Sequence, residues 1–209
     1  EDLNVMKQNT ERLLNLTNQL LDFRKTESQG FRLNFAKCNI TEVLKETHVR
    51  FTSLAKQKGL DFTLQVPEKD FYAHVNQEAF TKIISNLLNN GMKYAESYVH
   101  VMLEAPQRDD NNLFRIRTVN DGVIIPDAMK EEIFKPFVRF NEQEDGKVTT
   151  GTGIGLALSR SLAEFHLGTL VMEAGEESNI FCLTLPVVQD TTITLTPEAE
   201  VEIERVNEI

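Results

Sequence analysis

The predicted order of helices and strands indicates an α+β fold, in which helices gather on one face of a mixed sheet and one long helix precedes them. Two observations support this assignment. Segments with alternating apolar residues, which are typical of half-buried strands, are separated by longer segments with helical periodicity. The composition, with 41% hydrophobic and 26% charged residues, is that of a globular protein with a packed core. At about 150 residues per domain, the 209 residues correspond to between one and two domains.

A long first helix is predicted over residues 1–27 because apolar residues recur there at heptad spacing. The stripe is formed by Leu13, Leu16, Leu20 and Phe23. No Gly or Pro interrupts the segment before Gly30. A helix with such a stripe buries it against a partner, so we expect pairing with a second helix of the same or another chain. An ordinary amphipathic helix packed on the globular body is the alternative.

The remaining elements follow from local patterns in chain order. Thr41 is the predicted N-cap of the second helix, and Asn76 or Gln77 begins the third. The stretch 141–152 contains only Val148 as an apolar residue, so it is predicted to be a mobile loop. Helices are predicted at 40–57, 76–94, 127–134 and 154–165, and strands at 31–36, 61–66, 71–75, 98–104, 113–119, 169–174 and 179–185.

Charge and cysteine content exclude several classes of function. The net charge of −10 argues against nucleic acid or an anionic membrane as a direct partner, because both select basic surfaces. Cys38 and Cys182 lie far apart without CxxC spacing, so neither a zinc site nor a disulfide framework is indicated. No apolar run approaches the ~18 residues of a membrane span, and no signal peptide is visible. Since the sequence begins inside a helical pattern without Met, we expect a piece of a longer protein.

A polar face of the third helix carries the first candidate site. Asn86, Asn90 and Lys93 occupy positions i, i+4 and i+7, so they share one side of the helix and can converge on one object. Amide oxygens can ligate Mg²⁺, and a Lys ammonium can hold a phosphate. A merely solvated Asn-rich face is the alternative. The opposite side of this helix is expected in the core, with Ile83, Ile84, Leu87 and Leu88.

A glycine-rich segment, 149-TTGTGIGL-156, is the second candidate. Gly151, Gly153 and Gly155 lie where a polar loop meets an apolar helix, so the backbone can approach a ligand closely and the helix N-terminus can face an anion. The segment lacks the GK[ST] of a Walker loop, and no strand directly precedes it as in the dinucleotide fingerprint. A turn that is simply flexible is the alternative.

The third candidate, 119-VNDGVIIP-126, lies at the end of a predicted strand. A polar pair and a Gly followed by apolar residues can form the floor of a pocket that reads the edge of a base. A strand-to-helix turn capped by Asn120 or Asp121 explains the same pattern equally well.

Taken together and in this order, these segments and Ile133–Phe137 (IFKPF) resemble a known family, the ATP-binding catalytic domain of sensor histidine kinases. Residues 86–95, 120–126, 133–137 and 151–156 resemble its N, G1, F and G2 boxes. The resemblance covers residues 31–186 and implies a two-layer α/β sandwich of the Bergerat ATP-binding type. Residues 1–27 resemble the second helix of a dimerisation and phosphoacceptor hairpin. The sequences RLNFAKCNITEVL and NDGVIIP most resemble those of hybrid two-component sensors of Bacteroides type. The implied domains are a hairpin remnant at 1–29, the ATP-binding domain at 30–187 and a linker at 188–209.

The resemblance also implies roles for individual residues. Asn90 would ligate Mg²⁺ with support from Asn86, and Lys93 would contact a phosphate, so Asn90 and Lys93 are the implied catalytic residues. Phe137 would help to anchor a lid that closes through the glycines. The implied ATP-binding residues are Asn86, Asn90, Lys93, Tyr94, Asn120, Gly122, Ile125, Phe137, Gly151, Thr152, Gly153, Gly155 and Leu156.

Two positions depart from the family pattern. The G1 box begins with Asp, whose carboxylate accepts a hydrogen bond from the adenine amino group, whereas Asn120 stands here, and a neutral acceptor is weaker. Ile124 replaces the second Gly of that box and is expected to crowd the adenine pocket. A shift by one residue would bring Asp121 into the role but would misplace Gly122.

The implied function is to donate the γ-phosphate of ATP to a histidine on a hairpin helix, for onward transfer to a response-regulator aspartate. His48, His74, His100 and His166 all lack the phosphoacceptor context, so the chain alone is not expected to phosphorylate itself. The implied setting is a homodimeric sensor, anchored in the inner membrane, of which this chain is a cytoplasmic part. A nucleotide-binding or interaction module with a degenerate adenine pocket is the alternative. A gyrase- or chaperone-type ATPase is disfavoured, because Asn86 stands where those enzymes place a catalytic Glu.

Overall fold

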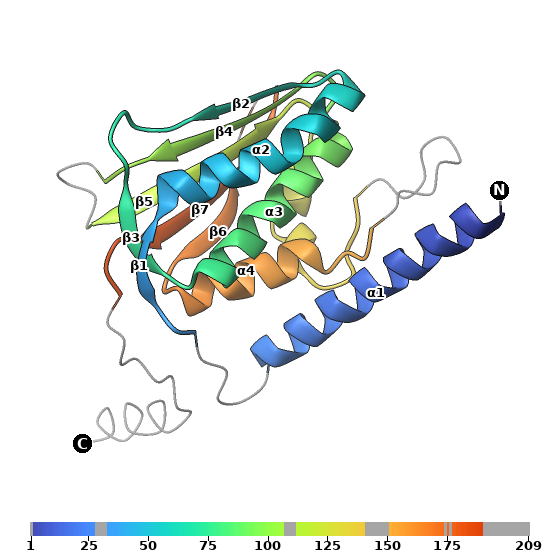
Figure 1. Ribbon diagram of the computed structural model, residues 1–209, viewed down its shortest axis with the longest axis horizontal. Helices are drawn as coiled ribbons and strands as arrows, with labels where there is room; N and C mark the ends of the chain where they lie inside the picture. Colours follow the sequence, from blue (N-terminus) through green and yellow to red (C-terminus); the bar gives the residue numbers. More distant parts are fainter. Residues whose placement is uncertain are drawn as a thin grey trace.

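Five strands form the main sheet of the computed structural model: β2 (Asp61–Gln65), β4 (Tyr98–Glu104), β5 (Leu113–Asn120), β6 (Thr169–Glu173) and β7 (Asn179–Pro186). Their order is β2-β4-β5-β7-β6 (Figure 1). β2 and β4 pair in parallel and all other neighbours pair antiparallel, so the sheet is mixed, as predicted. The structure describes residues 2–27, 33–106, 112–140, 151–173, 175 and 177–189. Most of the loop expected at 141–152 and of the tail after 187 lies outside them.

Three helices cover one face of this sheet (Figure 1). They are α2 (Ile40–Lys58), α3 (Gln77–Tyr94) and α4 (Gly155–Phe165). In place of the short helix expected at 127–134, two single turns of 3₁₀-helix at Asp127–Met129 and Glu132–Phe134 connect β5 to α4.

A second, smaller sheet corrects the expectation of one sheet. β1 (Ala36–Asn39) pairs antiparallel with β3 (Tyr72–Val75), with Ala36 opposite Val75. The strand expected at 31–36 therefore begins where it was predicted to end, because its pairing partner rather than its local pattern determines which residues are extended.

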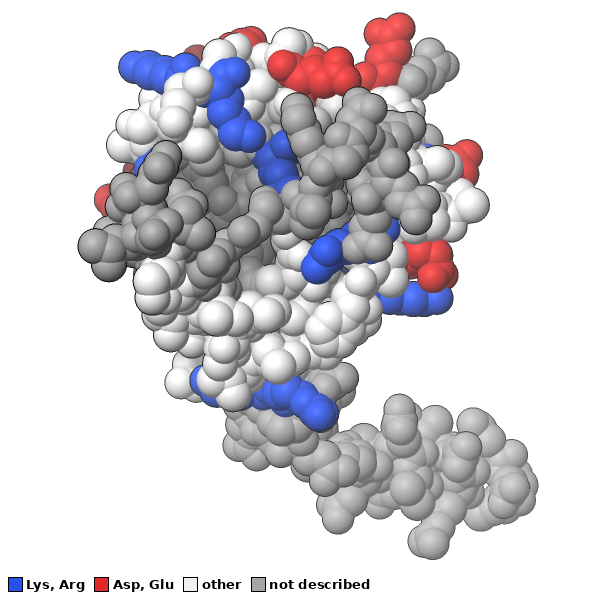
Figure 2. Space-filling view, turned by 90° about the vertical axis from the view of Figure 1, so that its right-hand side faces the viewer, with Lys and Arg blue, Asp and Glu red and all other residues white. Residues whose placement is uncertain are grey.

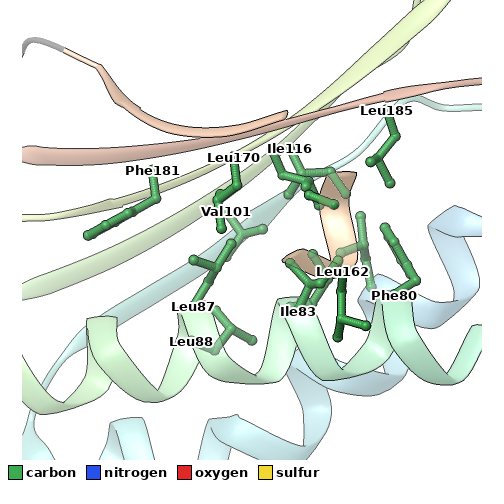
Figure 3. Packing of buried hydrophobic residues seen from close by; sticks show 14 of the residues in the cluster. Phe80, Ile83, Leu87, Leu88, Val101, Ile116, Leu162, Leu170, Phe181 and Leu185 are labelled. Atoms are coloured by element: carbon green, nitrogen blue, oxygen red, sulfur yellow. The ribbon is translucent and has the colours of Figure 1, made fainter. Parts of the chain in front are cut away.

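The apolar face of α3 forms the centre of the core. Ile83 and Leu87 are fully buried and lie between the helices and the sheet, facing residues such as Ile116 of β5 (Figure 3). Ile84 and Leu88 are buried beside them, as predicted. Each such side chain contributes about 1.5–3 kcal/mol through its burial. Since this face of α3 is anchored in the core, the Asn-rich side of the helix is held in a fixed direction.

The caps of α2 and α3 come from asparagines. Asn76 Oδ1 accepts a hydrogen bond from the Ala79 N–H at 2.9 Å, as predicted for the start of α3. The cap of α2 is Asn39, whose Oδ1 accepts from the Glu42 N–H at 3.2 Å. Thr41 is therefore not the cap; its buried Oγ1 accepts from the Phe71 N–H at 3.0 Å. The Thr41 hydroxyl therefore holds the residue before β3 and does not cap the start of α2.

Helix α1 (Asp2–Glu27) lies along the side of α4 (Figure 1). The Lys82 ammonium of α3 forms an ion pair with Asp22 at 2.7 Å, and Thr26 is buried near the end of α1. Leu13, Leu16 and Leu20 of the predicted stripe remain exposed and Phe23 packs against the core, so the stripe is only partly covered. None of the described helices is both long enough and apolar enough to cross a membrane.

Candidate functional site

A cavity of about 590 Å³ lies between the polar side of α3, the start of α4 and the ends of β5 and β7. This volume lies within the range of small-molecule sites. On the face shown in Figure 2, the surface is hollowed near its centre and Lys and Arg side chains lie around the hollow. Of the residues expected to bind a ligand, the cavity is lined by Asn86, Asn90, Lys93, Tyr94, Asn120, Ile125, Gly151, Thr152, Gly153, Gly155 and Leu156.

The polar side of α3 forms one wall. Asn86, Asn90 and Lys93 all face the cavity, so the expected convergence of these side chains is observed. Asn86 Nδ2 donates to Gly155 O at 3.3 Å and to Ser159 Oγ at 3.2 Å, which ties α3 to the start of α4. The Asn86 carboxamide thus fixes the distance between the two helices.

The glycine segment faces this wall. A Cβ built on Gly151 would lie 2.9 Å from the Lys93 ammonium, so the loop and the positive charge are in direct proximity. Lys93 Nζ also donates to the Tyr94 hydroxyl at 2.6 Å. The backbone N–H groups of the first turn of α4 have no partner within the helix, so an anion between Lys93 and this turn meets a cation and helix N–H groups together.

Gly153 is required by its backbone conformation. Its φ is 70°, and a Cβ there would lie 2.8 Å from the backbone of Phe137. The Phe137 N–H donates to Gly153 O at 2.9 Å. Phe137 does not line the cavity and is 63% exposed, and its backbone meets the glycine segment.

Asn120 lies at the other end of the cavity, where β5 ends. Its side chain is only 3% exposed, and its Nδ2 has no hydrogen-bond partner among the described residues. Apolar side chains surround this end, among them Val123, Ile125 and Phe181. This end of the cavity suits a flat apolar ring with a polar edge.

Asp121 takes no part in the cavity. Its carboxylate accepts hydrogen bonds from the backbone N–H groups of Glu96, Ser97 and Tyr98 and from the Ser97 hydroxyl. Burial raises the pKa of this carboxyl, but these hydrogen bonds outweigh it and hold the pKa well below its usual range. Asp121 therefore does not cap its own turn but binds the segment between α3 and β4, whereas Asn120 faces the cavity.

Asn179 at the start of β7 is a cavity residue that sequence reasoning missed. It pairs with Asn120 in the β5–β7 register. Its Oδ1 accepts from the Ile125 N–H at 3.0 Å, and its Nδ2 donates to Gly122 O at 3.3 Å and Val123 O at 3.0 Å. Asn179 thereby holds the turn after β5 in place. Only knowledge of the strand pairing would have pointed to it.

Gly122 and Ile124, the other notable residues of this turn, do not line the cavity. A Cβ on Gly122 would lie 1.9 Å from the backbone oxygen of Tyr94, so Gly122 is needed for this close approach. Ile124 is 39% exposed and directed away. The expectation that Ile124 crowds the pocket is wrong, because Asn179 holds the turn with its neighbours Val123 and Ile125 facing inward.

Helix α1 contributes an unexpected part of the wall. Leu13, Leu16 and Gln19 line the cavity, and Thr152 Oγ1 donates to Gln19 Oε1 at 2.7 Å. This contact joins residues 133 positions apart, so local sequence patterns carry no signal for it.

The four histidines lie outside the cavity. His48 stacks on Phe62, and His100 lies 3.3 Å from Asp61. The two cysteines are free and buried. No group of three His, Cys, Asp or Glu side chains that could hold a metal is found in the described part of the chain.

The sequence and the fold of this chain are similar to those of several known proteins. Residues 75–200 match the family model of histidine kinase-, DNA gyrase B-, and HSP90-like ATPases. Sensor histidine kinase WalK of Bacillus subtilis is 26% identical over 189 residues, which is 90% of this chain and 31% of WalK. Full-length ShkA in complex with AMPPNP superposes with a TM-score of 0.75 at 19% identity, over 90% of this chain and 39% of ShkA. Histidine kinase ThkA in complex with response regulator protein TrrA gives 0.69 at 21% identity, over 88% and 50%.

Proposed function

The chain belongs to the family of histidine kinase-, DNA gyrase B- and HSP90-like ATPases, and we propose that it is the ATP-binding catalytic part of a sensor histidine kinase. Its substrate would be ATP, whose γ-phosphate passes to a histidine on a hairpin helix and then to a response-regulator aspartate. The chain spans 31% of the length of WalK. In this proposal the acceptor histidine is on the hairpin helix and is none of the four histidines of this sequence.

The two unlike ends of one cavity carry this proposal. Lys93 and the first turn of α4 offer positive charge and N–H groups at one end, which suits a polyphosphate. Asn120 offers a polar group within an apolar pocket at the other end, which suits adenine. ATP has this same division into an anionic tail and a flat base.

The side chains of the cavity suit Mg²⁺ only when the phosphates of ATP supply further oxygen ligands. Asn90 supplies a neutral amide oxygen, and no carboxylate lines the cavity in the part of the chain that the structure describes. Mg²⁺ commonly takes few protein ligands and completes its shell with substrate phosphates and water. Asn90 would hold the ion, which neutralises charge on the phosphates when bound.

Because no carboxylate lines the described part of the cavity, we expect the site to support phosphoryl transfer better than hydrolysis of ATP. Asn86 occupies the position where a general base would activate water, and its carboxamide nitrogen is bound to Gly155 and Ser159. Attack by water is therefore unassisted. The side chains of this site orient the phosphates and stabilise their charge, so an external nucleophile brought into line is the expected acceptor.

The partners follow from the same proposal. Residues 1–29 would be the second helix of a dimerisation and phosphoacceptor hairpin, and the exposed Leu14, Leu20 and Leu21 would pack against its other helices in a homodimer. A response-regulator receiver domain would take the phosphate, as the complex of ThkA with TrrA suggests. The intact protein would be a membrane-anchored sensor, of the hybrid Bacteroides type, with this part in the cytoplasm.

Substitution of Asn90 tests the proposal. Calorimetric titration should give Mg²⁺-dependent binding of ATP to the wild-type chain. Asn90→Ala should weaken binding with Mg²⁺ at least about tenfold, equivalent to ~1.4 kcal/mol, and should leave the Mg²⁺-free affinity nearly unchanged.

Gln77→Ala provides the matched control, because Gln77 is exposed at the far end of the same helix. Absence of binding by the wild-type chain at millimolar ATP would instead favour an interaction module with a degenerate base pocket.

A further inference from the structure

One polar group in the base end of the cavity has no partner among the described residues. Three polar side chains lie near the turn after β5, and two of them are fully engaged. The carboxylate of Asp121 accepts hydrogen bonds from residues 96–98, and both ends of the Asn179 carboxamide bind the backbone of the turn. The Asn120 Nδ2 group is buried and unpaired among the described residues. A buried donor without an acceptor is costly, so an orientation of the carboxamide in which Nδ2 meets an acceptor on the ligand is favoured.

The carboxamide of Asn120 differs from a carboxylate in the hydrogen bonds that it can make. A carboxylate only accepts, whereas a carboxamide donates through Nδ2 and accepts through Oδ1. Rotation by half a turn about the last side-chain bond exchanges the two atoms. Since Nδ2 has no partner in the part of the chain that the structure describes, this rotation breaks no hydrogen bond of that nitrogen there. Asn179 lacks this freedom because both of its ends are bound.

Purines differ at their six-position in this same respect. Adenine offers an amino donor there beside the ring acceptor N1. Hypoxanthine offers the carbonyl acceptor O6 beside the ring donor N1–H. A carboxamide matches either pattern in one of its two orientations, whereas a carboxylate facing O6 leaves two acceptors opposed. The two bases have nearly the same shape, so the apolar walls formed by Val123, Ile125 and Phe181 do not distinguish them.

On the basis of the ATP-binding function proposed above, we propose that Asn120 opens the site to 6-oxopurine nucleoside triphosphates as well as ATP. The Asn120 carboxamide recognises the edge of the base in either of two orientations. The site is then specific for a purine but not for the amino or oxo group at its six-position. Its position is fixed by the β5–β7 pairing with Asn179, and its neighbour Gly122 is held against the Tyr94 backbone.

Competition between ATP and inosine triphosphate tests this inference on the whole 209-residue chain. Dissociation constants of both nucleotides with Mg²⁺ are measured by calorimetry for the wild type, Asn120→Asp and Asn112→Asp. The wild type should bind the two nucleotides within about fivefold of each other, and Asn120→Asp should weaken inosine triphosphate relative to ATP at least about tenfold. Asn112→Asp adds the same charge at an exposed turn outside the cavity, so it should keep the wild-type ratio.

Each other outcome has a distinct meaning. If the wild type binds ATP but binds inosine triphosphate more than about thirtyfold more weakly, this inference fails and the proposed function stands. If the wild type binds no nucleotide, the proposed function itself fails, and this inference with it.

A second variant covers the event that Asn120→Asp does not fold. Asn120→Ala removes both the donor and the acceptor, so it should weaken ATP and inosine triphosphate to a similar degree. A loss of ATP affinity with unchanged affinity for inosine triphosphate would show that the carboxamide does not contact the 6-oxo base, and would overturn the inference.

Discussion

His166 ends α4 and joins it to the beginning of α3 through Nε2, while Nδ1 holds the ring on α4. Its Nδ1 lies 2.6 Å from Leu162 O, and its Nε2 accepts from the Asn76 N–H at 3.1 Å. Because the Asn76 N–H must donate, the ring is neutral with its proton on Nδ1. The ring is fully buried, and this burial lowers the pKa of His166 below its ordinary value. A histidine that sequence reasoning left without a role is therefore a structural link between two helices of the site.

This link predicts a loss of stability in mild acid. Below about pH 6.5 the unfolded chain protonates this histidine while the folded chain resists it, so the unfolded state binds more protons and the free energy of unfolding falls as the pH falls. His166→Gln should lower that free energy by about 2–4 kcal/mol at neutral pH and remove this part of its pH dependence. Urea denaturation at about pH 7.5 and about pH 5.5 measures both effects. An equally steep loss in His166→Gln would assign the pH dependence to other groups.

The polar contacts that hold helix α1 include the Asp22–Lys82 ion pair and the hydrogen bond from Thr152 to Gln19. The ion pair is partly exposed, so each of these contacts is worth no more than about 1 kcal/mol. Phe23 also packs against the core. Among the described residues, α1 nevertheless buries far fewer side chains than α3, so its attachment is weaker.

Removal of both contacts should release α1 without unfolding the rest. In the double variant Gln19→Ala, Asp22→Asn, we expect hydrogen exchange of the α1 backbone to rise several-fold, while exchange in α3 stays unchanged. Thr10→Ala is the matched control, because Thr10 is exposed and its hydroxyl donates to Met6 O within the same helix. Equal acceleration in α1 and α3 would mean that the two helices unfold as one unit.

Elements with a strong periodic pattern could be predicted from the sequence nearly to the residue. α3 and β4 lie where their patterns indicate, since each buries one face along its whole length. β1 is displaced from its predicted position because a short strand is defined by its partner. The same distinction holds in the site. The spacing of Asn86, Asn90 and Lys93 within one helix was sufficient to predict their convergence, whereas Gln19 and Asn179 reach the cavity only through tertiary packing.

The residues that line the cavity come from segments that span most of the chain, from α1 to β7. A ligand bound there stabilises all of these segments together. At a concentration one hundred times its dissociation constant, ATP with Mg²⁺ should add about 2.7 kcal/mol to the free energy of unfolding and raise the melting temperature by about 5–10 °C. Thermal unfolding followed by circular dichroism measures this shift. Asn90→Ala should reduce it strongly at the same ATP concentration, and an undiminished shift would contradict the role of Asn90.

The backbone hydrogen bond from Phe137 to Gly153 has a consequence for which residues the chain tolerates at these two positions. Phe137 has a φ of 66° and Gly153 a φ of 70°. A proline at position 137 would lose the N–H that donates and could not adopt this φ. A side chain at position 153 would lie 2.8 Å from the Phe137 backbone. Neither residue can therefore be exchanged freely without moving the backbone beside the cavity.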